Sequence, residues 1–337
     1  MKWMIWLLSL ATAVAMSPSA RADAVADFYR GRTVYMVIGY GAGGGYDLYG
    51  RIAAEFLGKH IPGNPTIVPQ NMPGAGSFKA AQYLYSAAPK DGTYLGSVAQ
   101  TLAMDTAMGD KGGLDATKLP YLGRLTSNID LGVALLKTGI KSFEDARARQ
   151  YAVGTTGGAS TAVLLPASLN AYAGAKFKLV KGYQGAADVL LALERGEVDV
   201  GGAIGIPNLL TRHPDWLKGG ATILYQAALK RHRLLPEVPT LPELGLTDEG
   251  KAVLRAIAST AEIGRSILTT PGVPPERLSA LRKAFADMTR DPEFLATCEK
   301  RNITLDVGSG EAMDAIVQET MQTPKPVLSK IQGLLNL

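Results

Sequence analysis

The residues best placed to do chemistry stand in "GYGAGGGYD", residues 39–47, between an apolar β-branched run and a helical pattern. Gly39, Gly41 and Gly44 satisfy the spacing G-x-G-x-x-G, which is typical of a dinucleotide-binding turn. Glycines also let several backbone N–H groups converge on a small anion, and the positive end of the following helix adds to that attraction. The loop therefore fits a dinucleotide, a small carboxylate, or simply a tight turn from strand to helix.

The two phosphate-binding interpretations of this loop each require further residues that the sequence does not have. A P-loop requires Lys and then Ser or Thr after its glycines, but Gly45 is followed by Tyr46 and Asp47. A dinucleotide site needs an acidic residue near the end of the next strand, where "TIVPQNM" has Gln70 and Asn71 instead. The sequence thus favours a small anion bound by backbone N–H groups, with a plain structural turn as the alternative. We expect no cofactor.

Side chains that could bind a metal or act as nucleophiles are scattered. His60, His213 and His232 are isolated from one another and from Cys298, the sole cysteine, which lies in a helical pattern and is expected to be packed. A metal site needs clustered ligands, so we expect none. No G-x-S-x-G elbow is present, and we assign no catalytic residue. A secreted α/β enzyme acting on a small acid remains the alternative to a binding protein, because catalytic groups need not be close in sequence.

The N-terminus has the features of a secretory signal. Lys2 precedes the apolar run "WMIWLLSLATAVAM", and Ala20-Arg21-Ala22 fits a signal-peptidase site, so we expect residues 1–22 to be removed. An uncleaved anchor is the alternative. The segment holds two basic and no acidic residues, so its removal lowers the formal net charge from +5 to +3. Charges are interspersed, without the basic stripe typical of nucleic-acid surfaces, so we expect no nucleic-acid partner.

Strand-like and helical patterns alternate along the chain. The strand patterns "TVYMVIGY", "TIVPQNM" and "YLGSVAQ" are interleaved with the helical stretches "YDLYGRIAAEFLGKHI" and "SFKAAQYLYSAA". This βαβ rhythm predicts a mostly parallel sheet covered by helices. A second α/β unit is predicted to begin near Leu125, because the rhythm restarts with "YAVGTTGGAS", "TAVLLPASLNAYAG", "FKLVKGY", "AADVLLALERGE" and "VDVGGAIG".

The C-terminal part is helical and has too few strands for a sheet of its own. Its helical patterns are "PPERLSALRKAFADMTRDPEFLATCEKRNI" and "SGEAMDAIVQETMQTPKPVLSKIQGLL". These helices must pack on one of the two units, which makes one domain discontinuous. We expect lobe 1 to comprise residues 23–124 and 250–337, and lobe 2 to comprise residues 125–249.

A second Gly-rich turn, "GTTGGAS", lies in the second unit. It again places small residues with free N–H groups and hydroxyls between a strand and a helix. Ligands in open α/β sheets bind at the carboxyl ends of the strands, where both loops would lie. The two loops are therefore expected to face each other across a cleft between the lobes.

Seven short motifs follow one another along the mature chain: "GAGGGYDLYGR", "NMPGAGS", "APKDGTYLG", "GTTGGAS", "LERGEVDVGG", "EVPTLPELG" and "TTPGVPPERLSALRKAF". In this order they closely resemble the extracytoplasmic receptors of tripartite tricarboxylate transporters, the Bug or TctC-like family. The resemblance implies an α/β, type II periplasmic binding protein fold, with two α/β lobes joined by two crossing strands and the ligand cleft between them. It further implies a periplasmic protein that captures a small mono- or dicarboxylate for membrane transporter subunits or a sensor kinase. We expect a monomer.

The resemblance also implies which residues contact the ligand. Gly43, Gly44 and Asp47 would hold one carboxylate from lobe 1, together with Gly157 and Ser160 from lobe 2, through backbone N–H groups, small hydroxyls and ordered waters. The full set of candidate ligand-binding residues is Gly41, Ala42, Gly43, Gly44, Tyr46, Asp47, Gly76, Gln100, Thr156, Gly157, Gly158, Ser160 and Gln184.

Two positions in the loops leave the identity of the ligand open. Tyr46 stands where the family commonly has a small residue, and Ala159 lies in a turn that is often Gly-x-Gly-Ser. Tyr46 either lines the cleft or packs outward, since aromatic side chains suit pockets and cores equally. Asp47 either caps backbone N–H groups at the start of its helix or meets an amino or hydroxyl group of the ligand.

Overall fold

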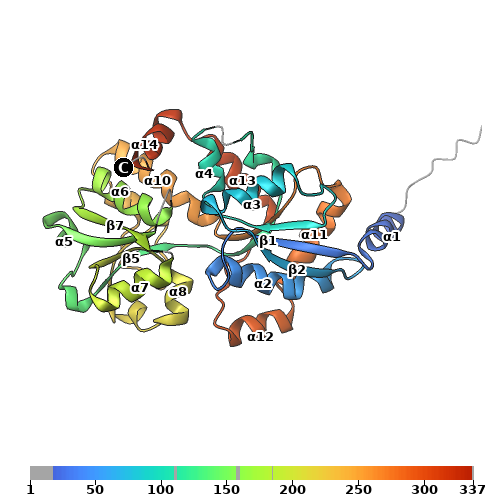
Figure 1. Ribbon diagram of the computed structural model, residues 1–337, viewed down its shortest axis with the longest axis horizontal. Coiled ribbons are helices and arrows are strands. Elements are labelled where there is room, and N and C mark those ends of the chain that lie inside the picture. The colour runs from blue at the N-terminus through green and yellow to red at the C-terminus, as the bar shows by residue number, and fades with distance from the viewer. Residues whose placement is uncertain (1–17, 110–111, 157–159, 184, 336–337) are drawn as a thin grey trace, which may run out of the picture.

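The computed structural model describes residues 18–109, 112–156, 160–183 and 185–335, which form two α/β lobes side by side (Figure 1). The strands of the first lobe are, in spatial order, β11 (Gly308–Ser309), β4 (Tyr121–Thr126), β10 (Arg265–Thr269), β3 (Tyr94–Ser97), β1 (Thr33–Ile38) and β2 (Thr66–Asn71). Strand β1 pairs in parallel with β2 and β3, as the βαβ rhythm predicts, whereas β10 is antiparallel to both of its neighbours.

Helices cover both faces of this sheet, because successive side chains of a strand point to opposite faces. Met36 and Ile38 of β1 belong to one core, and Val37 belongs to the other. Helices around the first core are α1 (Pro18–Tyr29), α2 (Gly45–Leu57), α11 (Pro275–Met288) and α12 (Pro292–Lys300). Helices around the second core are α3 (Phe78–Ser86), α4 (Leu102–Ala107) and α13 (Gly310–Met321).

The second lobe is built on a five-stranded sheet. In spatial order its strands are β7 (Phe177–Tyr183), β6 (Tyr151–Thr156), β8 (Val200–Gly205), β5 (Asp130–Leu135) and β9 (Ala221–Gln226). One face is covered by α5 (Phe143–Ala148), α6 (Thr161–Ala173), α9 (Leu241–Leu244), α10 (Asp248–Ser259) and α14 (Lys325–Leu335). The other face is covered by α7 (Ala186–Arg195) and α8 (Ile206–Arg212).

The chain passes between the lobes at three places in the described residues. Residues 127–129 connect β4 of the first sheet to β5 of the second, and residues 260–264 lead back from α10 to β10. These are the two crossings expected from the resemblance. A third crossing, at residues 322–324, takes the chain from α13 on the first lobe to α14 on the second.

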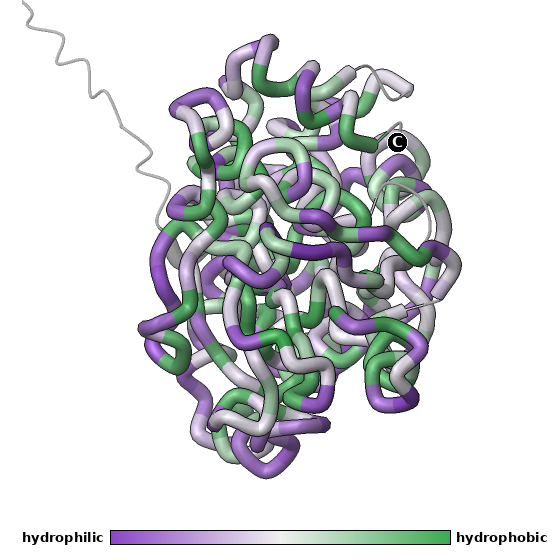
Figure 2. Tube along the Cα trace, turned by 90° about the vertical axis from the view of Figure 1, so that its left-hand side faces the viewer, coloured by the Kyte–Doolittle hydropathy of each residue, from purple (hydrophilic) through white to green (hydrophobic). Residues whose placement is uncertain are grey.

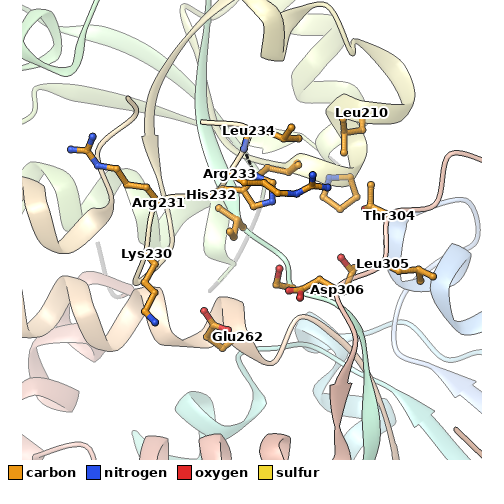
Figure 3. A pocket seen from close by; sticks show the side chains of 15 residues that line it. Leu210, Lys230, Arg231, His232, Arg233, Leu234, Glu262, Thr304, Leu305 and Asp306 are labelled. Carbon is orange, nitrogen blue, oxygen red and sulfur yellow. Dashed lines mark hydrogen bonds between the residues drawn. The ribbon is translucent and has the colours of Figure 1, made fainter. Parts of the chain in front are cut away.

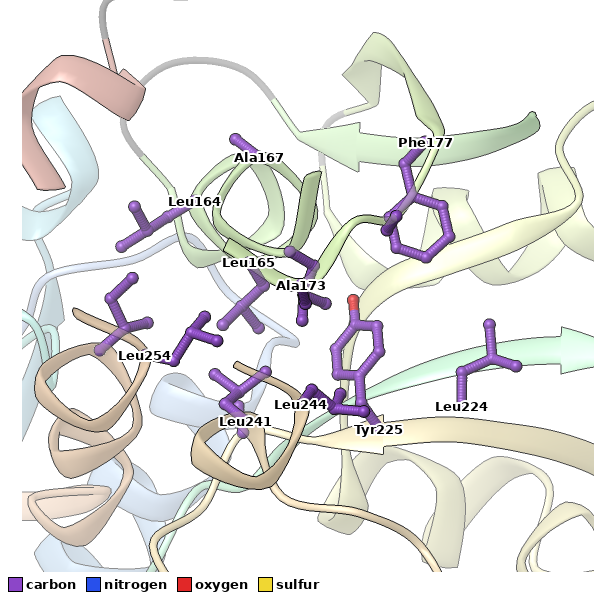
Figure 4. Packing of buried hydrophobic residues seen from close by; sticks show 14 of the residues in the cluster. Leu164, Leu165, Ala167, Ala173, Phe177, Leu224, Tyr225, Leu241, Leu244 and Leu254 are labelled. Carbon is purple, nitrogen blue, oxygen red and sulfur yellow. The ribbon is translucent and has the colours of Figure 1, made fainter. Parts of the chain in front are cut away.

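The positions of helices α10 and α14 show that the lobe boundary predicted from the sequence is wrong. Helix α14 and most of α10 lie within residues 250–337, which we expected on lobe 1, yet both helices pack on α6 of the second lobe. Figure 4 shows Leu254 of α10 beside Leu164 and Leu165 of α6. The physical reason is that α6 buries 9 of its 13 residues, so the sheet alone cannot cover it. Leu254 of α10 and Ile331 of α14 share its core with Leu165. Helices α11 and α13 lie on the first lobe.

Hydrophobic and hydrophilic residues are interspersed along the tube in Figure 2. Within the described part of the chain, no helix is long and apolar enough to cross a membrane. Helix α1 begins at Pro18 and so runs across the expected cleavage site after Ala22. The cleavage therefore stays a prediction.

Candidate ligand-binding site

The loop between β1 and α2 faces open space. Gly41 and Gly44 are exposed, and a β-carbon added at Gly41, Gly43 or Gly44 would meet no atom within 4 Å. Gly43 has a φ of +85°, which favours glycine. Gly39 serves packing instead, because a β-carbon there would lie 1.9 Å from Ser77 Oγ. A small anion can therefore approach the loop backbone and the first turn of α2.

Asp47 holds this loop in place. One carboxylate oxygen accepts a hydrogen bond from the Gly43 backbone N–H at 2.8 Å, and the other accepts from Arg51 Nε and Asn71 Nδ2, each at 2.8 Å. Burial opposes ionisation of the carboxyl, but these hydrogen bonds lower the pKa of Asp47 below its ordinary value. The N-cap of α2 is Gly44, so the N-cap position that we considered for Asp47 is wrong, although its carboxylate does accept a backbone N–H at the start of the helix. Its contacts within lobe 1 support a structural role.

Tyr46 packs inward at the base of the loop, in contact with polar groups. Its ring is stacked on Tyr40, with centroids 4.4 Å apart and an interplanar angle of 12°. The Cζ atom of Arg265 lies 3.7 Å from the centroid of the same ring. The Tyr46 hydroxyl accepts a hydrogen bond of 2.8 Å from the Gln100 backbone N–H. Tyr46 therefore positions Arg265 and Gln100, and the outward orientation that we considered is wrong.

Arg265 is a buried cation that the sequence analysis missed. It is the first residue of β10 and is only 9% exposed. Its Nη2 donates to Asn128 Oδ1 at 2.9 Å, whereas its buried Nε has no hydrogen-bond partner. The guanidinium lies beside the start of α2, because a β-carbon added at Gly45 would be 3.2 Å from Nη2. In "EIGRSILTT" no motif or spacing marks this arginine, and its surroundings come from distant parts of the chain.

Asn128 and Asp130 place further polar groups where the chain crosses between the lobes. Asn128 Nδ2 donates to Asp130 Oδ1 at 3.4 Å, and the side chain of Thr161, the first residue of α6, also bonds the Asp130 carboxyl. Burial raises the pKa of Asp130, against the lowering effects of the Arg265 charge and of these hydrogen bonds. The cluster thus links the start of α2 on one lobe to the start of α6 on the other.

Gln100, one of the candidate ligand-binding residues, also belongs to this cluster; its contact with a ligand stays a prediction. It is 4% exposed, and its Nε2 donates to the Asn128 backbone oxygen at 3.4 Å. Its Oε1 is buried and has no hydrogen-bond partner. Gly76 belongs to the same lobe. Its carbonyl accepts a hydrogen bond of 3.5 Å from the hydroxyl of Tyr40, the residue stacked on Tyr46.

The second loop is described only at its edges. Gly157, Gly158 and Gln184 lie outside the described residues. Thr156 is the last residue of β6, and Ser160 is the N-cap of α6, where its side chain makes no capping hydrogen bond. The structure therefore brings together the lobe 1 candidates and Gln100, and places Ser160 next to Thr161 on the opposite lobe.

A cavity of about 340 Å³ lies elsewhere between the lobes, beside the crossing segment (Figure 3). It is lined by Ser127, α8, the basic residues 230–233, Glu262 and Asp306. None of the candidate ligand-binding residues lines this cavity. Its two acidic residues are already paired with Arg124, at 3.2 Å and 3.0 Å. Arg265 and Gln100, which carry the unpartnered buried atoms, do not line this cavity.

Comparison with known proteins identifies related chains. The sequence model of the tripartite tricarboxylate transporter family receptor, TctC, matches residues 50–333, beginning just after the first Gly-rich loop. The UPF0065 protein in the gbd 5′ region of Cupriavidus necator is 27% identical over 331 residues, which is 96% of this chain and 95% of that protein.

Two solved structures have the same fold. The periplasmic binding protein BugD superposes with a TM-score of 0.67 at 18% identity, covering 91% of this chain and 98% of BugD. MatC from Rhodopseudomonas palustris, solved with bound malate, superposes with a TM-score of 0.65 at 21% identity, covering 88% of this chain and 99% of MatC.

Proposed function

Because the chain belongs to the tripartite tricarboxylate transporter receptor family, we propose that it captures a small organic carboxylate in the cleft between its two lobes. Members of this family are periplasmic binding proteins and not enzymes, so an enzyme acting on a small acid is no longer the alternative. MatC, which shares the fold, was solved with malate. For the present chain a mono- or dicarboxylate of similar size is the ligand class that we propose.

The open backbone of the first loop is the observation that carries the proposal. Gly41 and Gly44 have open space where a side chain would stand, close to the N-terminal end of a 13-residue helix, where the helix dipole favours negative charge, whereas the Gly43 N–H already donates to Asp47. Lys59, the nearest lysine downstream of the loop, is ion-paired with Asp291 and Glu293, each at 2.7 Å. In this proposal the N–H groups of the loop and the helix terminus attract the carboxylate, and a lysine is not needed.

The proposal also covers export, lobe closure and delivery of the ligand. In this proposal the chain is exported, loses residues 1–22, and acts in the periplasm as a monomer. Residues from both lobes complete the polar shell around the ligand, so binding draws the lobes together. The closed form then delivers the ligand to membrane transporter subunits or reports it to a sensor kinase.

A thermal-unfolding screen over small organic acids tests the proposal. A true ligand at about a hundred times its dissociation constant adds about 2.7 kcal/mol to the free energy of unfolding. Inorganic phosphate and NAD serve as controls for the phosphate and dinucleotide interpretations of the loop. The proposal fails if no acid raises the unfolding temperature, or if NAD raises it more than any acid does.

A further inference from the structure

We propose that Arg265 and Gln100 form a paired recognition site, in which Arg265 binds the ligand carboxylate and Gln100 accepts a hydrogen bond from a hydroxyl or amino group on the same ligand. This inference rests on the proposed function and narrows its ligand class to carboxylates that carry such a donor. Neither residue belongs to the Gly-rich loops, so the site adds a specificity element to the backbone anion site.

The first part of the argument is a buried cation without a direct ion pair among the described residues. The Asp130 carboxyl feels its charge, but the two side chains are joined through Asn128. Arg265 is 9% exposed, its Nε lacks any hydrogen-bond partner, and it makes no ion pair among the described residues. A buried cation is costly unless an anion or several hydrogen bonds compensate it. Its guanidinium also lies beside Gly45, at the positive end of α2. Two sources of positive potential therefore lie side by side, and a ligand carboxylate supplies the direct ion pair that Arg265 does not make with Asp130.

The second part is a buried acceptor without a donor. Gln100 Oε1 has no partner, while Gln100 Nε2 donates to the Asn128 carbonyl. The orientation of this amide follows from chemistry, because the flipped amide would set two carbonyl oxygens against each other. A buried acceptor left unpaired costs about 1–3 kcal/mol. A hydroxyl or amino group on the ligand satisfies this oxygen, whereas an unsubstituted acid leaves it unpaired.

The third part is that both groups are held by the same two residues. Arg265 lies on the ring of Tyr46 and donates to the side chain of Asn128. Gln100 donates its backbone N–H to the hydroxyl of Tyr46 and its side-chain amide to the backbone of Asn128. A free donor and a free acceptor thus lie around one pair of side chains. A 2-hydroxy or 2-amino acid carries a carboxylate and a donor group on neighbouring carbon atoms, so one such ligand supplies both partners.

The test is isothermal titration of the purified chain with matched pairs of acids. Propionate is compared with lactate and with alanine, and succinate with malate and with aspartate, so that each pair differs by one donor group. We expect the parent to bind the substituted acid of at least one pair about tenfold or more tightly. If the parent binds unsubstituted acids as well as substituted ones, water satisfies Gln100 Oε1 and the inference is wrong.

Variants separate the two roles. Gln100→Met keeps the length of the side chain but removes the amide, and should abolish the preference for the hydroxyl or amino acid while leaving the affinity for the unsubstituted acid within about threefold. Arg265→Gln should weaken every acid by about a hundredfold, and Arg265→Lys should restore part of that loss because it restores the charge. Thermal unfolding of each variant without ligand checks that it folds.

Arg301→Gln is the matched control for removal of a cation, since Arg301 is half exposed and paired with Glu55 on the surface. It should leave every affinity unchanged. Acids that bind the parent and Arg265→Gln equally well overturn this inference but leave the proposed function intact. If no acid of the series binds the parent, the inference and the proposed function fail together.

Discussion

The guanidinium of Arg265 lies over the ring of Tyr46, with its Cζ atom 3.7 Å from the ring centroid, although the two residues belong to separate chain segments of the first lobe. An aromatic face stabilises a cation that has lost its water. On its other face the same ring is stacked on Tyr40, and its hydroxyl accepts the Gln100 backbone N–H. Tyr46 is therefore the residue through which the loop, the buried cation and Gln100 are held in one arrangement.

Removal of the Tyr46 hydroxyl should destabilise the protein. Tyr46→Phe keeps the ring beneath Arg265 but leaves the buried Gln100 N–H without its acceptor, so we expect the free energy of unfolding to fall by about 1–3 kcal/mol. Urea unfolding measures this loss. Tyr172→Phe is the control, because that side chain is only half-buried. Equal stability of Tyr46→Phe and the parent would contradict the role of this hydrogen bond.

Gly44→Val should block ligand binding without unfolding the protein. Gly44 has φ −87° and ψ 173°, an extended conformation that valine adopts readily, and its β-carbon would enter open space. The new side chain would occupy the space where the ligand approaches the loop. Calorimetry should show a strong loss of affinity, whereas Lys59→Ala should change it little. Unchanged affinity in Gly44→Val would place the ligand elsewhere.

Asp47→Asn should cost stability in a pH-dependent manner. The folded pKa of Asp47 is lowered, so its carboxylate stabilises the fold above the unfolded pKa and loses that contribution as the pH falls through the folded value. We expect the variant to be about 1–3 kcal/mol less stable at pH 7, with the difference shrinking below about pH 4. Urea titrations across this range provide the measurement. Glu299→Gln, on an exposed helix face, should show no such trend.

The C-terminal helix should be essential to the second lobe. Ile331 of α14 is fully buried in the core that contains α6, so Ile331→Ala should lower the free energy of unfolding by about 2–5 kcal/mol. Leu295→Ala is the matched control, because Leu295 is 43% exposed. Similar losses in both variants would argue that α14 is not part of that core.

Cys298 should react slowly in the folded protein. It is 1% exposed, and burial raises the pKa of its thiol to about 11, so almost none is thiolate at pH 8. Iodoacetamide labelling followed by mass spectrometry should be slow without denaturant and fast in urea. Rapid labelling of the folded chain would show that α12 opens readily.

Much of the fold could be predicted because its signals are local. The β-branched run before Gly39 forms β1, the amphipathic stretch after Gly44 forms α2, and Pro275 begins α11 where a first turn tolerates proline. Alternation of such patterns is enough to predict two α/β units, because helices that follow strands must pack back on a sheet. The Gly-rich loop was likewise identified from the spacing of its glycines.

The partners of α6 could not be predicted from local patterns. This helix is apolar on every side, which indicates burial but does not say which helices cover it. Only the tertiary structure shows that α10 and α14 provide that cover. The amphipathic face of α14 would fit either lobe. We therefore assigned all residues after 250 to lobe 1, whereas α10 and α14 belong to the hydrophobic core of the second lobe.

The sequence by itself determined the two-lobe α/β class, the exposed Gly-rich loop and the family motifs, since each depends on residues that are neighbours along the chain. The tertiary structure alone decided the chemistry beside that loop. Arg265 lies in β10 and Asn128 in the crossing segment, and no sequence motif marks either of them, whereas Gln100, which follows β3, was among the candidates named from the sequence. The unpaired atoms of Arg265 and Gln100 indicate a binding site only because they are buried. A polar group without a protein partner is ordinary in water but costly in a protein interior.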